Sequence, residues 1–356
     1  MIKKVLFLCL VMTSIFAKNP SLESMIAQML MVGVGGDESS DKWVKQLQED
    51  IKKDRVGGII LFKNNVKNQK ELKKLTTSFK NIKTKQPLFI AVDQEGGKVQ
   101  RLSSKNGFND YPAARDIEKN KNLEQTYRTY KKLADELKEY GFNVNFAPVV
   151  DLNINPNSPA IGTKKRSYSD KEEIVISYAN EFINAQNDAG IVSVLKHFPG
   201  HGSAVADSHK RLTDVSSTWQ YKELKPYYYF VKYKKAKAIM VSHVTLDKFD
   251  KNYPASLSKN IINGLLREQL GFDGVVFSDD MNMKAITDIY TLKQAVIKAI
   301  NAGVDVLVFS SYFTKKSSVI REVREIILQA IKHGDIDKKT IENSYRRVKE
   351  LKNDIN

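Results

Sequence analysis

Residues 191–209 read I-V-S-V-L-K-H-F-P-G-H-G-S-A-V-A-D-S-H and contain three of the five histidines in the chain. The apolar run Ile191–Leu195 is typical of a buried strand. It leads into a loop that contains Pro199, Gly200 and Gly202 and carries several ionisable side chains. Parallel sheets and barrels place their chemistry on such loops, at the carboxyl ends of strands. The stretch therefore indicates an enzyme built on a parallel sheet.

Apolar runs of similar length recur along the chain, with glycine, asparagine or proline at their edges. They predict strands at Met29–Val34, Val56–Phe62, Pro87–Asp93, Val144–Asp151, Ile191–His197, Ala236–Val244, Gly274–Asp280 and Val304–Ser310. Amphipathic segments between them predict helices at Asn122–Tyr140, Lys171–Ala189, Lys222–Tyr233, Ser258–Leu270 and Leu292–Ala302. This alternation indicates a parallel sheet covered by helices, because right-handed crossovers need them. The pattern predicts an α/β fold, a (β/α)8 TIM-type barrel, as one domain over residues 18–356.

The amino terminus reads M-I-K-K-V-L-F-L-C-L-V-M-T-S-I-F-A. Lys3 and Lys4 precede a mainly apolar run, and the small residue Ala17 follows at a suitable cleavage point. Because the run is too short to cross a bilayer comfortably, residues 1–17 are predicted to be a secretory signal peptide; an uncleaved anchor is the alternative. We therefore expect an exported, periplasmic bacterial protein without a stable membrane span once the signal is removed.

The composition argues against a disulfide-stabilised protein, a thiol enzyme and a nucleic-acid-binding protein. Cys9 is the single cysteine and lies in the signal segment, so the mature chain would use no disulfide and no thiol nucleophile. The formal charge of +16 falls by two, to +14, when Lys3 and Lys4 leave. Lysines are spread through helical segments and form no basic block interleaved with aromatic residues. We expect a solvated basic surface, no nucleic-acid partner and a monomer.

Polar side chains end five of the predicted strands. They are Asp93, Asp151, Lys196 with His197, His243, and Asp279 with Asp280. In a barrel these ends converge on one face, although they are far apart in the sequence. Asp279 has the same strand parity as Val275 and Phe277, so its side chain is expected on the core side of the strand. Asp280 then faces the other way and is expected to support neighbouring structure or cap a helix. For Asp151, helix capping is an alternative role, and His243 is expected to be a hydrogen-bonded core histidine.

Two mechanisms could use these residues. In metal-assisted hydrolysis, zinc would be bound by His197, His201, Asp207 and His209. The spacing of His197 and His201 suits a metal only on a helix, and Pro199–Gly200 between them disfavours one. In covalent catalysis, a carboxylate attacks the substrate while Asp207 fixes the tautomer of His209, the acid and base. We favour the second mechanism and expect neither a metal nor another cofactor.

Four motifs follow one another along the chain: D-Q-E-G-G-K-V-Q-R from Asp93, K-H-F-P-G-H-G from Lys196, D-S-H from Asp207 and G-F-D-G-V-V-F-S-D-D-M-N-M from Gly271. With these motifs, the chain closely resembles family 3 glycoside hydrolases of the β-N-acetylglucosaminidase (β-hexosaminidase) type, in their compact single-barrel form. The resemblance implies a retaining exo-hydrolase that removes terminal β-linked N-acetylglucosamine. It implies peptidoglycan fragments as the usual bacterial substrate.

The resemblance also implies roles for individual residues. Asp279, the first aspartate of S-D-D, would be the nucleophile, His209 the acid/base and Asp207 its partner. The residues implied to hold sugar hydroxyls are Asp93, Arg101, Arg166, Lys196 and His197. His201 would shape the loop. The signal peptide departs from the pattern, because the recycling enzymes of this group are often cytoplasmic.

The residues suit this chemistry in their own right. A retaining glycosidase needs two groups about 5 Å apart, one to attack C1 and one to protonate the leaving oxygen. Asp279 on a rigid strand suits the first task, and an imidazole with a pKa of roughly 6.5 suits the second. Because His209 adds no negative charge beside Asp279, phosphorolysis stays open beside hydrolysis. A non-catalytic sugar-binding protein of the cell wall is the other alternative, and the natural aglycone is left open.

Overall fold

The computed structural model describes residues 20–206, 212–313 and 318–355. Eight parallel strands form one sheet, in the order β10, β1, β2, β3, β4, β5, β7, β9. Their bounds are β1 Leu30–Gly33, β2 Gly58–Leu61, β3 Phe89–Val92, β4 Val144–Asn145, β5 Val192–Phe198, β7 Ala238–Val241, β9 Val275–Ser278 and β10 Leu307–Phe309. Each strand coincides with one of the predicted apolar runs, and only β5 extends past its predicted end. The predicted (β/α)8 barrel is confirmed.

The two edge strands of the sheet, β9 and β10, approach each other and almost complete the barrel. Phe277 and Val306 form a parallel bridge, and the N–H of Ser278 donates to the carbonyl of Val306 at 3.0 Å. Asp305 and Val306 donate in turn to the carbonyl of Val276. These bonds satisfy backbone groups that an open sheet would expose at its edges.

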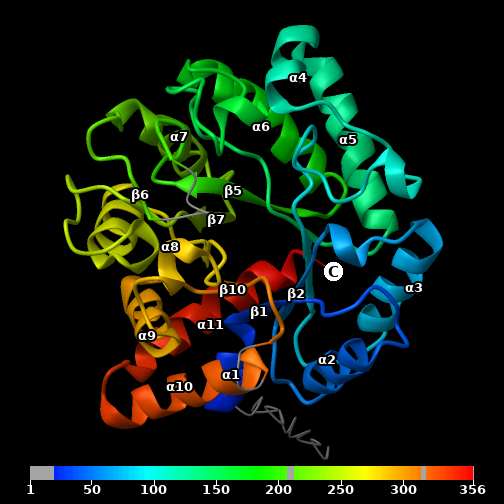
Figure 1. Ribbon diagram of the computed structural model, residues 1–356, viewed down its shortest axis with the longest axis vertical. Helices are drawn as coiled ribbons and strands as arrows, with labels where there is room; N and C mark the ends of the chain where they lie inside the picture. The colour runs from blue at the N-terminus through cyan, green and yellow to red at the C-terminus, as the bar shows by residue number, and fades with distance from the viewer. Residues whose placement is uncertain (1–19, 207–211, 314–317, 356) are drawn as a thin grey trace, which may run out of the picture.

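Helices surround the strands in chain order (Figure 1). The outer ring contains α2 Lys42–Lys52, α3 Gln69–Lys80, α5 Leu123–Glu139, α6 Glu172–Asn187, α7 Lys225–Lys232, the π-helix η6 Asn260–Gln269, α9 Leu292–Ala302 and α10 Val319–His333. Shorter helices are α1 Leu22–Gln28, α4 Ala114–Asn120 and α8 Lys284–Thr287. The five predicted helices correspond to α5, α6, α7, η6 and α9. Within the described ranges, no helix has the combination of length and apolarity that spanning a membrane would require.

Strand side chains alternate between the inside of the barrel and the helices. The inner cluster takes members from all eight strands, among them Met31, Ile60, Phe89, Phe146, Met240, Phe277 and Val308. The ring of Phe277 lies 5.5 Å from that of Phe146 and 6.0 Å from that of Phe89. Val275 and Phe277 therefore face the barrel interior, as their parity predicted.

The last helix, α11 Lys338–Asn353, covers the amino-terminal end of the barrel. Its residues Val348 and Leu351 join the inner cluster. Nζ of Lys352 donates to Oε1 of Gln28 and to the carbonyl of Gly57, each at 2.7 Å. Because Gly57 directly precedes β2, these contacts belong to the end where the strands begin. The opposite end of the barrel is left for the functional groups.

A small second sheet, β6 Thr213–Asp214 with β8 Val244–Thr245, follows β5 and β7. The apolar run predicted as one strand, Ala236–Val244, is thus divided, with β7 ending at Val241. The predicted signal peptide, residues 1–17, lies outside the described residues.

Candidate active site

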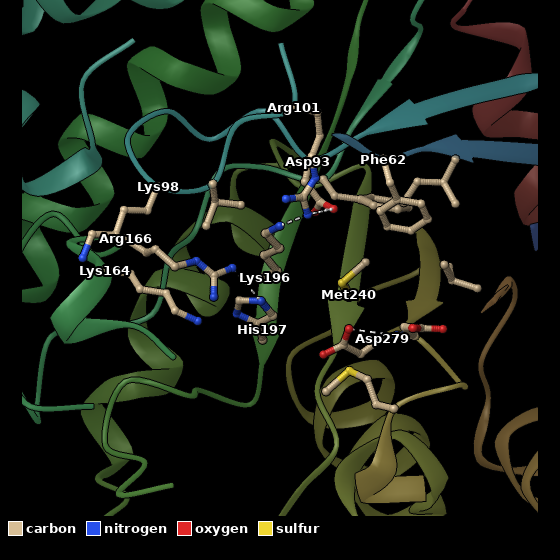
Figure 2. Close-up of a pocket in the computed structure, with 16 residues that line it drawn as sticks. Phe62, Asp93, Lys98, Arg101, Lys164, Arg166, Lys196, His197, Met240 and Asp279 are labelled. Carbon is tan, nitrogen blue, oxygen red and sulfur yellow. Dashed lines mark hydrogen bonds and ion pairs between the residues drawn. The ribbon is translucent and has the colours of Figure 1, made fainter. Parts of the chain in front are cut away.

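A pocket of about 390 Å³ lies at the carboxyl-terminal end of the barrel. Its apolar lining includes the inner-cluster residues Ile60, Phe146, Met240 and Val308. The polar residues that line it include Asp93, Arg101, Arg166, Lys196, His197 and Asp279, six of the eight predicted site residues. Figure 2 shows Arg166 and His197 on one side of the pocket and Asp279 on the other. The remaining two, Asp207 and His209, lie outside the described residues.

Lys196 and His197 are consecutive, yet both side chains line the pocket. The pairing of β5 with β7 shifts register between Leu195 and Phe198, so regular alternation is interrupted where these residues lie. Irregularities of this kind often redirect side chains beside a functional site. The end of β5 therefore supplies two adjacent polar groups to one wall.

Lys196 connects two carboxylates that follow β3. Its Nζ lies 2.8 Å from Oδ1 of Asp93 and 2.7 Å from Oε1 of Glu95. Nη2 of Arg101 donates to the second oxygen of Asp93 at 2.9 Å. Burial raises the pKa of Asp93, but the charges of Lys196 and Arg101 outweigh it and hold that pKa well below its usual value. Asp93 is thus a fixed anion that can accept hydrogen bonds from sugar hydroxyls.

Glu95 was not predicted as a site residue, although it lies in the quoted motif. It forms a bidentate pair with Arg166, with Nε to Oε2 at 2.9 Å and Nη2 to Oε1 at 2.7 Å. Burial opposes its ionisation, yet Arg166 and Lys196 lower the pKa of Glu95 to about 2. The spacing Asp93-x-Glu95 was the available signal, because residues two apart in extended chain share a face.

Asp151 fixes the orientation of His197. Its Oδ2 lies 2.7 Å from Nδ1 of the imidazole, and its Oδ1 accepts the backbone N–H of His201 at 2.8 Å. Nη2 of Arg166 lies 3.2 Å from Nε2 of the same ring. These partners lie at the end of β5 and in the loop that follows it, and not at the start of a helix, so the capping interpretation of Asp151 is wrong. Asp151 is instead a positioning residue beneath the pocket wall.

The same contacts argue against His197 as a zinc ligand. Both ring nitrogens of His197 are occupied, one by a carboxylate and one by a guanidinium, so neither offers a lone pair to a metal in this arrangement. Across residues 20–206, 212–313 and 318–355, no group of three or more His, Cys, Asp or Glu side chains is arranged to hold a metal ion.

The two aspartates after β9 have different surroundings. Both line the pocket, and Oδ1 of Asp279 accepts the N–H of Asp280 at 2.8 Å. Oδ1 of Asp280 accepts the N–H groups of Asn282 at 3.0 Å and Ser310 at 2.8 Å. Burial raises the pKa of Asp280. Asp280 therefore supports the loops after β9 and β10, as predicted, although it also lines the pocket, which its parity did not predict.

His243, the other histidine predicted at a strand end, is completely buried. Its Nε2 donates to the carbonyl of Asp280 at 3.0 Å, and its Nδ1 accepts from the hydroxyl of Ser256 at 2.6 Å. The prediction of a hydrogen-bonded core histidine is confirmed.

Comparison with known proteins adds to this geometry. The model of the Glycosyl hydrolase family 3 N terminal domain matches residues 21–351. The beta-hexosaminidase of Photobacterium profundum is 37% identical over 73% of this chain and 76% of its own length. Beta-hexosaminidase A of Pseudoalteromonas piscicida is 31% identical over 86% of this chain, which spans only 55% of that protein. A solved family 3 beta-N-acetylglucosaminidase from a Paenibacillus species superposes with a TM-score of 0.85 at 33% identity, over 94% of this chain and 62% of its own.

Proposed function

The chain belongs to glycoside hydrolase family 3, and we propose that it is a retaining exo-β-N-acetylglucosaminidase, a β-hexosaminidase, acting on peptidoglycan fragments. The observation that carries this proposal is the placement of Asp279 across one pocket from the charged group of Asp93, Arg101, Lys196 and His197. A sugar bound through its hydroxyls on the charged side would present its anomeric carbon toward the carboxylate. The beta-hexosaminidase names of the relatives support the choice of sugar.

The shape of the pocket supports cleavage at the end of a glycan. Its inner boundary is made of barrel-interior side chains such as Phe146 and Met240, with α11 beyond them at the opposite end of the barrel. A bound glycan can therefore continue only toward the mouth. We infer that one terminal sugar enters and that the aglycone stays at the rim.

The proposed reaction has two steps. Asp279 attacks C1, which forms a glycosyl–aspartate bond while the bond from C1 to the leaving oxygen breaks and His209 gives that oxygen a proton. His209 then takes a proton from water, which attacks C1, releases the sugar with retained configuration and frees Asp279. Asp207 would fix the tautomer of His209, as Asp151 fixes that of His197. Lys196 and Arg166 would hold the sugar during both steps.

The test is incubation with purified muropeptides and with chitobiose, followed by mass analysis of the products. We expect N-acetylglucosamine to leave the non-reducing end, with the β-anomer appearing first in a proton NMR time course. Early α-anomer would contradict the retaining mechanism. Formation of N-acetylglucosamine 1-phosphate in phosphate buffer would replace hydrolysis by phosphorolysis, and no turnover of any β-glycoside would favour the non-catalytic sugar-binding protein.

We propose further that the chain is a periplasmic monomer with one barrel domain, residues 18–356, released from the signal peptide 1–17. The mature protein would then start at Lys18. Amino-terminal sequencing of the protein from a periplasmic fraction and light scattering of the purified protein test these points.

A further inference from the structure

A buried carboxyl that the proposed reaction does not use lies beneath the K-H-F-P-G-H-G loop. It belongs to Glu223 in the short helix η4 Tyr221–Leu224, directly before α7. The residue is completely buried. Its Oε1 accepts the N–H of Gln220 at 3.1 Å, while Oε2 is buried without a hydrogen-bond partner among the described residues. A buried polar atom in this state needs an explanation, because leaving it unsatisfied is unfavourable.

The surroundings of Oε2 connect it to the sugar site. A Cβ placed on Gly200 would lie 2.9 Å from both Cβ and Oε2 of Glu223, so the carboxyl packs directly on the loop backbone. Beside it, Nε1 of Trp219 donates to the carbonyl of Pro199 at 3.0 Å. The next residue of the loop, His201, donates its N–H to Asp151. The turn Gly200–Ser203 is therefore held between Glu223 and the carboxylate that orients His197.

We propose that Glu223 is a positioning residue of the sugar site, whose neutral carboxyl supports the turn Gly200–Ser203 and thereby keeps His197 seated on Asp151. Its effect on turnover rests on the proposed function; its effect on folding does not.

The groups that face this carboxyl explain why it should be neutral. Among the described residues they are the N–H of Gln220, the N–H and hydroxyl of Ser203, the phenol of Tyr227 and the carboxylate of Asp151. Burial raises the pKa of Glu223 to about 7, and Asp151 acts in the same direction, while the N–H of Gln220 and the nearby polar groups of Ser203 oppose them. Ionisation would thus add a second buried negative charge beside the carboxylate that fixes His197. We expect that charge to loosen the turn.

Helix capping alone does not require an acid at this position. In two other helices the side chain at the corresponding position also accepts the N–H of the residue before the helix, and it is a glutamine in both: Gln125 in α5 and Gln294 in α9. Glutamine can therefore replace Glu223 and still accept the N–H of Gln220. The variant Glu223→Gln keeps the size of the side chain and one acceptor oxygen but cannot ionise.

The experiment compares wild type, Glu223→Gln, Glu223→Ala and the matched cap variant Gln294→Ala. Thermal unfolding from pH 4 to 9 is the first measurement. Because the folded pKa of about 7 exceeds the ordinary value of 4.5, wild type should lose stability relative to Glu223→Gln as the pH rises from 4.5 to 7, with no further change above. A difference in Tm that does not vary with pH would overturn the proposal.

Steady-state kinetics on a chromogenic β-N-acetylglucosaminide is the second measurement. Glu223→Ala should lower kcat/KM at least fivefold, whereas Gln294→Ala, which loses an equivalent cap, should not change it. In Glu223→Gln the alkaline limb of the kcat/KM profile should move to higher pH. Unchanged kinetics in both Glu223 variants would overturn the positioning role. If wild type turned over no β-glycoside, the proposed function would fail, while the unfolding comparison would still decide the state of Glu223.

Discussion

Oδ2 of Asp151 lies 2.7 Å from Nδ1 of His197, and both side chains are buried. Because a carboxylate only accepts hydrogen bonds, Nδ1 carries the proton, and Nε2 presents its lone pair to the guanidinium of Arg166. The imidazole is therefore held in one tautomer and one orientation. Asp151 achieves this from behind the pocket wall, because it is not among the lining residues.

Replacing Asp151 with asparagine tests that arrangement. The amide keeps the size of the side chain but cannot offer two acceptor oxygens, so one N–H of His197 or His201 loses its partner. A hydrogen bond to a buried charge contributes about 1.5–3 kcal/mol, which predicts a loss in kcat/KM of about tenfold to a hundredfold. The control is Asp250→Asn, a buried carboxylate outside the pocket that accepts from Ser258 at 2.6 Å. It should lower Tm without changing kcat/KM, and equal kinetics in both variants would contradict the role of Asp151.

The Glu95–Arg166 pair predicts a specific acid sensitivity. The folded pKa of Glu95, about 2, lies below its ordinary value of 4.5. Its ionised form therefore stabilises the fold above pH 4.5, and this contribution is lost as the pH falls from 4.5 toward 2. In Glu95→Gln, Tm should consequently fall less over that interval than in wild type. Glu49→Gln, which removes only a surface ion pair with Lys53, should follow wild type. If Tm fell by the same amount with pH in wild type and in Glu95→Gln, the prediction would be refuted.

The strands could be predicted because parallel barrel strands are buried on both faces and are therefore almost continuously apolar. Strand ends also revealed Asp93, Lys196 and Asp279, since polar residues directly after such runs have few structural reasons to be there. These signals are local, so the sequence shows them without knowledge of the fold.

Glu95 and Asp151 show where local signals fail. The partner of Glu95 is Arg166, 71 positions away on another loop, and only the assembled barrel brings them together. Asp151 looked equally suited to a helix cap, because its partners are His197 in β5 and His201 after it, and the residues next to Asp151 in the sequence do not identify them. Roles that depend on a contact across the barrel could not be derived from spacing alone.

The last helix is rich in charged residues, and its sequence does not distinguish Lys352, which is completely buried, from the exposed lysines around it. Burial lowers the pKa of Lys352 from 10.5 to about 7. Since the unfolded chain keeps this proton up to about pH 10.5, wild type should gain stability relative to Lys352→Met as the pH rises from 7 toward 10. The measurement is the difference in Tm across that range. Lys349→Met, at an exposed position of the same helix, is the control and should give a constant difference; a constant difference for Lys352→Met would contradict the burial argument.

Asp279→Asn should reduce cleavage of a chromogenic β-N-acetylglucosaminide on the order of a thousandfold or more, because the amide cannot form the glycosyl–enzyme bond. Tm should stay close to that of wild type, since the backbone N–H of Asp279 still donates to Val241. In Asp279→Ala, added azide should restore turnover and give an α-glycosyl azide, because it attacks C1 from the vacated side. A β-glycosyl azide, or retained activity in Asp279→Asn, would remove Asp279 as the nucleophile.

Asp207 and His209 are proposed to act as one unit, and a double-mutant cycle measures this directly. Asp207→Ala and His209→Ala should each lower kcat on the order of a hundredfold, because either change removes a correctly oriented acid and base. If the carboxylate works only through the imidazole, the double variant should be little slower than His209→Ala. The control is Ser208→Ala, which changes the residue between them and should leave kcat unchanged. An unchanged kcat would show that the losses do not come from altering this segment in general. Losses that multiply in the double variant would mean that the two residues contribute independently.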